Sequence, residues 1–163
     1  MADVTIELLK TQLRQLRLPT MVREFERLAR DAAANDQSPA ELLLRLTEVE
    51  LASRSANAVA ARIKNAGFPV EKDFDAYDFS AMPNLSKPKV LELARGDWID
   101  QKFNCCLVGS HGTGKTHLSV ALGLAACRGG LRVRFFTAAE LVNRLEKEQK
   151  QYTLDRFLGQ LEK

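Results

Sequence analysis

The chain has 163 residues, of which 45% are hydrophobic and 28% are charged. This balance is typical of a globular protein with a buried core and excludes an intrinsically disordered chain. The formal net charge of +3 permits binding to nucleic acid but does not by itself indicate it. No apolar run approaches membrane-spanning length, and the first residues carry no secretory signal pattern, so we expect a cytoplasmic protein without membrane contact.

Three helices are predicted in the first part of the chain. Apolar residues recur at helical spacing over residues 4–16 and 20–34, and Pro19 interrupts the pattern between them. A capping Ser38 followed by Pro39 and Glu41 begins a third helix, which Gly67 ends. Residues 1–68 are therefore expected to form an all-helical region that meets DNA or a partner protein.

The later part of the third helix carries polar and basic side chains beside small alanines, namely Arg54, Asn57, Arg62 and Lys64. A solvated helix face is the ordinary explanation of such a pattern. Contact with nucleic acid is the alternative, and so modest a basic excess leaves both interpretations open.

Residues 69–100 are predicted to form a linker with one short helix. Aromatic and turn residues replace the periodic pattern here, among them Phe74, Tyr77 and Phe79. Because aromatic side chains need burial, we expect the linker to pack against the rest of the chain. Ser86 can cap a short helix that ends near Gly96.

A short apolar run of strand length, Phe103–Val108, precedes the most informative stretch of the sequence. The glycines of that stretch let the backbone turn with positive φ, so that successive N–H groups and the start of the next helix converge on an anion. Lys115 is expected to reach the β- and γ-phosphates of ATP, and the Thr116 hydroxyl to bind Mg²⁺. The stretch has the pattern G-x-x-x-x-G-K-[ST] of a phosphate-binding loop and consists of Gly109, Ser110, His111, Gly112, Thr113, Gly114, Lys115 and Thr116.

A helix with a broad apolar face follows the loop and stops at Gly129. The next run, Leu131–Phe136, alternates apolar and basic residues as a strand with one buried face does. A capping box at Thr137 and Glu140 begins another helix, and residues 153–161 form a last amphipathic helix. The fold class is therefore predicted to be α/β, with an N-terminal helical region followed by part of a P-loop NTPase core over residues 101–163.

Two other kinds of site have weaker support. His111 and His117 lie near Cys105 and Cys106, but neighbouring strand residues point to opposite faces and do not easily hold one metal ion. No orienting carboxylate is recognisable for a nucleophilic Cys–His enzyme. We expect the cysteines to be small buried hydrophobic residues in a reducing compartment.

Several short motifs lie along nearly the whole chain, namely Leu16–Pro19, Phe68–Pro69, Asp78–Ser80, Gly96–Ile99, Gly114–His117 and Arg132–Phe135. Together they resemble the IstB-type ATP-binding proteins of insertion sequences, which are relatives of the DnaC helicase loaders. The resemblance implies an AAA+ ATPase that binds ATP and Mg²⁺, forms homo-oligomers and helps the transposase of the same insertion sequence on double-stranded target DNA. The family loop usually has two prolines where Ser110 and His111 stand, a change that we expect to be tolerated.

One departure from the family pattern concerns hydrolysis. Family members continue past the helix that matches residues 153–161 into a Walker B strand, a polar sensor residue and an arginine that acts across a subunit interface. No apolar run ending in two acidic residues follows Lys115 in this sequence. The resemblance therefore predicts an AAA+ core truncated before Walker B, as a fragment or as a truncated gene product. It would bind ATP weakly and contain no catalytic residues, which leaves open whether the chain is an enzyme.

Three functions remain possible at this point: an ATPase of DNA transposition, a helicase-loader-like interaction module that binds nucleotide without hydrolysis, and a small-molecule P-loop kinase. The kinase has the weakest support. A kinase normally begins at its phosphate loop, whereas about a hundred residues precede this one.

Overall fold

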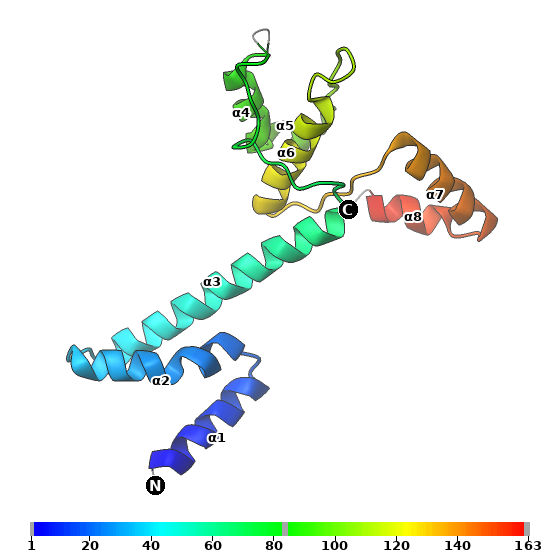
Figure 1. Cartoon of the computed structure of the whole chain (residues 1–163). Helices are drawn as coiled ribbons and strands as arrows, with labels where there is room; N and C mark the ends of the chain where they lie inside the picture. Colours follow the sequence, from blue (N-terminus) through cyan, green and yellow to red (C-terminus); the bar gives the residue numbers. More distant parts are fainter. Residues whose placement is uncertain (1, 83–84, 162–163) are drawn as a thin grey trace. The chain divides into compact units, whose positions relative to one another are not determined.

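The computed structural model describes residues 2–82 and 85–161. The chain divides into two compact units, Met1–Ala58 and Val59–Lys163, and each is considered by itself. The division falls inside a helix, so the predicted boundaries at residues 68 and 100 stay a prediction. Within the described residues the chain forms eight helices (Figure 1): α1 (Ala2–Gln15), α2 (Pro19–Ala34), α3 (Pro39–Ala66), α4 (Lys87–Arg95), α5 (Asp97–Asp100), α6 (Lys115–Arg128), α7 (Ala138–Lys150) and α8 (Leu154–Leu161).

The first unit confirms the three predicted N-terminal helices. Pro19 is the first residue of α2, as its fixed φ favours. The capping box before α3 is formed, because Ser38 N donates to Glu41 Oε2 at 2.6 Å and Glu41 N donates to Ser38 Oγ at 3.3 Å. The core of the unit is apolar, with Met21, Leu28 and Leu46 buried and Leu13, Leu18, Phe25, Leu42 and Val49 packed around them.

A side chain from α3 caps the start of α2. Leu18 precedes α2 and supplies no side-chain cap, so the first N–H groups of the helix need another acceptor. The buried Glu50 carboxylate accepts from Thr20 N at 2.8 Å and from Met21 N at 3.0 Å. Arg54 Nε donates to the other oxygen of Glu50 at 3.0 Å. Burial would raise the pKa of Glu50, but the hydrogen bonds from Arg54, Met21 and Thr20 outweigh it and lower the pKa.

We expect Glu50→Gln to destabilise the chain by about 1.5–3 kcal/mol, because the buried amides lose a charged acceptor. Urea unfolding at pH 7 measures the loss, with the exposed Glu48→Gln on the same helix as the control. Since folding lowers the pKa, the stabilisation by Glu50 is complete above the ordinary value of 4.5 and is lost as pH falls through the folded value. Equal stability of wild type and Glu50→Gln at pH 7 would show that this cap contributes nothing.

The second unit is built around α6, whose buried residues are Leu118, Val120, Ala121, Leu124 and Cys127. As predicted, α6 ends before Gly129. The end of α3 joins this unit through two hydrogen bonds: Phe135 N donates to Ala66 O at 2.8 Å, and Arg62 Nε donates to Cys127 O at 2.8 Å. The predicted capping box of Thr137 and Glu140 starts α7, which packs against α8.

The predicted strands, and with them the α/β fold class, are not confirmed: the residues that the structure describes contain helices and no strand. The alternation that suggested strands is nevertheless present. Cys105 and Leu107 are half-buried whereas Cys106 and Val108 are exposed, and in Leu131–Phe136 the two arginines are exposed. A strand also requires a backbone ladder with a neighbouring segment, and within residues 2–82 and 85–161 neither run has one.

Among the helices of the described residues, none combines the length and the apolar character needed to cross a membrane.

Candidate phosphate-binding site

The predicted phosphate loop lies immediately before α6. Gly114 is the N-terminal flanking residue of this helix and has a φ of 77°. Gly112 has a φ of 78°. Both values lie in the left-handed region that favours glycine, which is why the motif needs glycine at these positions. The loop residues from Gly109 to Gly112 are exposed, and Lys115 is the first residue of the helix.

The Lys115 ammonium group lies over the loop. Lys115 Nζ donates to Ser110 O at 2.5 Å and lies 3.4 Å from Thr113 Oγ1. Thr113 Oγ1 donates to the same carbonyl at 2.9 Å. These contacts hold a positive charge next to the free N–H groups at the start of α6, where the helix dipole also favours an anion.

The loop borders an open cavity of about 530 Å³. None of its lining residues is acidic, so the cavity offers a cation and backbone donors to an anionic ligand. The hydroxyl of Thr116 is its candidate oxygen ligand for a metal ion. The lining consists of His111, Gly112, Thr113, Gly114, Lys115, Thr116 and His117.

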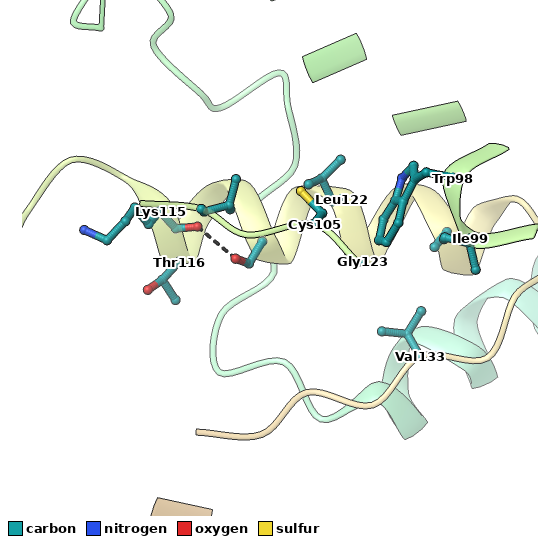
Figure 2. A pocket seen from close by; sticks show the side chains of 11 residues that line it. Trp98, Ile99, Cys105, Lys115, Thr116, Leu122, Gly123 and Val133 are labelled. Atoms are coloured by element: carbon teal, nitrogen blue, oxygen red, sulfur yellow. Dashed lines mark hydrogen bonds between the residues drawn. The ribbon is translucent and has the colours of Figure 1, made fainter. Parts of the chain in front are cut away.

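A second cavity, of about 400 Å³, shares Lys115 and Thr116 with the first and extends along α6 (Figure 2). Lys115 and Thr116 form one end of it, where Ser119 Oγ donates to Lys115 O at 3.0 Å. Its other end is apolar and includes Trp98, Ile99 and Val133. Both predicted strand segments contribute to the lining of this cavity, the first through Cys105 and Leu107 and the second through Val133.

The linker packs as its aromatic residues predicted. Tyr77 is buried in a cluster with Val90 and Leu118, and Phe74 and Phe79 pack against this cluster. The sequence did not predict that Tyr77 contacts the phosphate loop. The sequence motif predicts the loop from contiguous residues, whereas a contact from the linker depends on the tertiary fold.

The other candidate groups are placed differently. Cys106 is exposed and Cys105 half-buried, so the prediction of burial holds fully only for Cys127, where burial raises the pKa of the thiol. Within residues 2–82 and 85–161, no group of three or more His, Cys, Asp or Glu side chains is placed to hold a metal ion.

Two basic residues of the α3 face make intramolecular contacts. Arg54 binds Glu50 and also donates to the Arg17 carbonyl. Arg62 donates to the Cys127 carbonyl. Asn57 and Lys64 are exposed, so the nucleic-acid interpretation of this face stays a prediction that rests mainly on these two.

Comparison with known proteins yields one family. Residues 11–163 match the family model described as IstB-like ATP binding protein. The predicted ATP-binding protein of insertion sequence IS5376 from Geobacillus stearothermophilus is 33% identical over 144 residues, which cover 88% of this chain and 57% of the relative.

Two further relatives carry similar names. The predicted ATP-binding protein of insertion sequence IS21 from Pseudomonas aeruginosa is 31% identical, with 94% of this chain and 58% of the relative covered. That of insertion sequence IS232 from Bacillus thuringiensis is 30% identical, with 92% of this chain and 64% of the relative covered. The chain thus spans little more than half the length of these curated relatives.

Proposed function

Because the chain belongs to the family of IstB-like ATP binding proteins, we propose that it binds ATP at Gly109–Thr116 and helps a transposase act on DNA. The observation that carries the proposal is the geometry of the loop. Two glycines with positive φ precede the start of α6, and Lys115 places its charge over the same loop. The names of the relatives combine ATP binding with insertion sequences, and they support both ATP binding and a role in transposition.

The residues of the loop have distinct roles in this proposal. The N–H groups from Gly112 to Thr116 surround the phosphates, and Lys115 neutralises part of their charge. The Thr116 hydroxyl fits Mg²⁺ as a single protein ligand, since Mg²⁺ bound to nucleotides takes most of its ligands from phosphate oxygens and water. Bound Mg²⁺ would neutralise charge on the phosphates.

The apolar cavity beside the loop suits an α/β core. The family resemblance implies that further strands separate Phe103–Val108 from Leu131–Phe136. A cavity lined by Cys105, Leu107 and Val133 offers apolar side chains against which such strands could pack. We therefore propose the AAA+ arrangement for the whole family protein. The family resemblance further suggests that this protein forms homo-oligomers and that its partners are a transposase and double-stranded DNA.

A nucleotide-dependent interaction module without hydrolysis is the second candidate. It has one specific observation in its favour, because no acidic side chain of residues 2–82 and 85–161 lines the loop cavity. Both candidates require ATP binding, and they differ only in turnover.

A filter-binding assay with duplex DNA tests the proposed role. We expect the chain to retain more DNA when Mg²⁺-ATP is present, and Lys115→Ala to abolish the increase. Falling affinity at higher salt would accompany binding to the DNA backbone. DNA retention that is absent, or equal with and without ATP, would contradict the DNA part of the proposal.

A further inference from the structure

A buried tyrosine brings the linker against the phosphate loop. Tyr77 is 9% exposed, and its N–H donates to the Phe74 carbonyl at 3.1 Å, so a turn of the linker holds its backbone. Its ring meets the Phe79 ring edge-on at 4.8 Å between centroids, and the His117 ring at 5.0 Å. The ring is therefore enclosed on several sides rather than free to rotate away.

The same ring lies directly on Gly114. A Cβ atom built on Gly114 would lie 3.1 Å from Tyr77 Cε2 and 3.2 Å from the Tyr77 hydroxyl oxygen. These distances are tighter than most Cβ contacts, so a side chain at this position would require the ring to shift by a few tenths of an ångström. Since Gly114 also has a φ of 77°, both the conformation and the contact favour glycine at this position.

The linker is held to α6 by a second set of contacts. His117 Nε2, in the first turn of α6, lies within hydrogen-bonding distance of the Asp73 carbonyl oxygen at 3.0 Å. Arg128, the last residue of α6, pairs with the Asp73 carboxylate at 3.4 Å. Asp73 also accepts from the N–H groups of Asp75 and Ala76. These contacts fix the turn that presents Tyr77, and none of them uses a residue of the loop.

We propose that Tyr77 is a positioning residue for the phosphate loop, an inference that rests on the proposed nucleotide-binding function. By packing on Gly114, the ring keeps this residue in the left-handed conformation that aims the N–H groups of the following residues at the ligand. The side-chain hydrogen bonds given above for the loop, from Lys115 and Thr113 to Ser110, stay within the loop. A contact from outside the loop, here the Tyr77 ring, lowers the conformational entropy that the loop loses when it is ordered around a phosphate group.

The test compares the affinities of variants for Mg²⁺-ATP by equilibrium titration, well below the unfolding temperature. Tyr77→Ala is expected to bind about tenfold more weakly, equivalent to about 1.4 kcal/mol. Tyr77→Phe keeps the ring and is expected to restore affinity to within about twofold of wild type. Tyr77→Leu fills the space without a flat ring and is expected to stay weak, which keeps the test decisive if the alanine variant does not fold.

The other tyrosine of the chain provides the matched control. Tyr152 is 98% exposed, and Tyr152→Ala is expected to bind ATP as wild type does. If Tyr77→Ala or Tyr77→Leu lowers the unfolding temperature but binds ATP with wild-type affinity, Tyr77 is merely structural and the inference is overturned, while the proposed function stands. If the wild-type chain itself shows no saturable ATP binding, the proposed function fails and this inference fails with it.

Discussion

A preparation of the 163-residue chain is expected to bind Mg²⁺-ATP without releasing phosphate above background. In phosphate-loop NTPases the metal ion is held by the loop Ser or Thr together with a Walker B acid. Thr116 is the proposed source of the first of these groups, and among the described residues no acidic side chain lines the loop cavity to supply the second. Because phosphoryl transfer depends on positioning and charge stabilisation, a site that lacks these groups loses most of its rate.

Phosphate release in the presence of Mg²⁺-ATP measures this expectation, with Lys115→Ala as the background control. Turnover clearly above that control would mean that another group of this chain completes the site. The interaction-module candidate would then lose its supporting observation.

Lys115→Ala is expected to weaken ATP binding tenfold or more. The substitution removes a charge-assisted contact to phosphate, which is worth about 1.5–3 kcal/mol. It should leave helical content unchanged, because alanine is a good helix former at the first position of α6. Competition against a fluorescent ATP analogue measures the affinity, and circular dichroism measures the helix content.

Lys150→Ala is the matched control for this variant. Lys150 is exposed at the end of α7 and lies outside the lining of the loop cavity, so its removal should not change ATP affinity. Equal ATP affinity in Lys115→Ala and wild type would remove the main cation from the proposed site.

The sequence predicted most of the helices because their signals are local. Pro19 begins α2, and the capping boxes at Ser38 and Thr137 begin α3 and α7. Each signal acts within a few residues, so the surrounding fold does not change its meaning. The motif of the predicted phosphate loop is local in the same way, since all its groups are contiguous in the chain.

The sequence could not predict features that depend on contacts between distant residues. Glu50 looked like an ordinary charged residue on a helix, yet it caps the first turn of α2 by accepting from Thr20, 30 residues earlier in the chain. The contact of Tyr77 with Gly114 is of the same kind. The two predicted strands are not confirmed, because strand formation needs a partner segment, which an apolar alternation such as Leu131–Phe136 does not supply.

Calorimetric titration of the wild-type chain with ATP and, separately, with adenosine, both in the presence of Mg²⁺, tests the central claim most directly. The proposed site consists of backbone N–H groups and the Lys115 ammonium group, so it recognises phosphate rather than the nucleoside. We predict saturable binding of ATP at about one site per chain, and binding of adenosine that is at least about tenfold weaker. Equal affinity for the two ligands, or no saturable binding of ATP, would contradict the assignment of Gly109–Thr116 as a phosphate-binding loop.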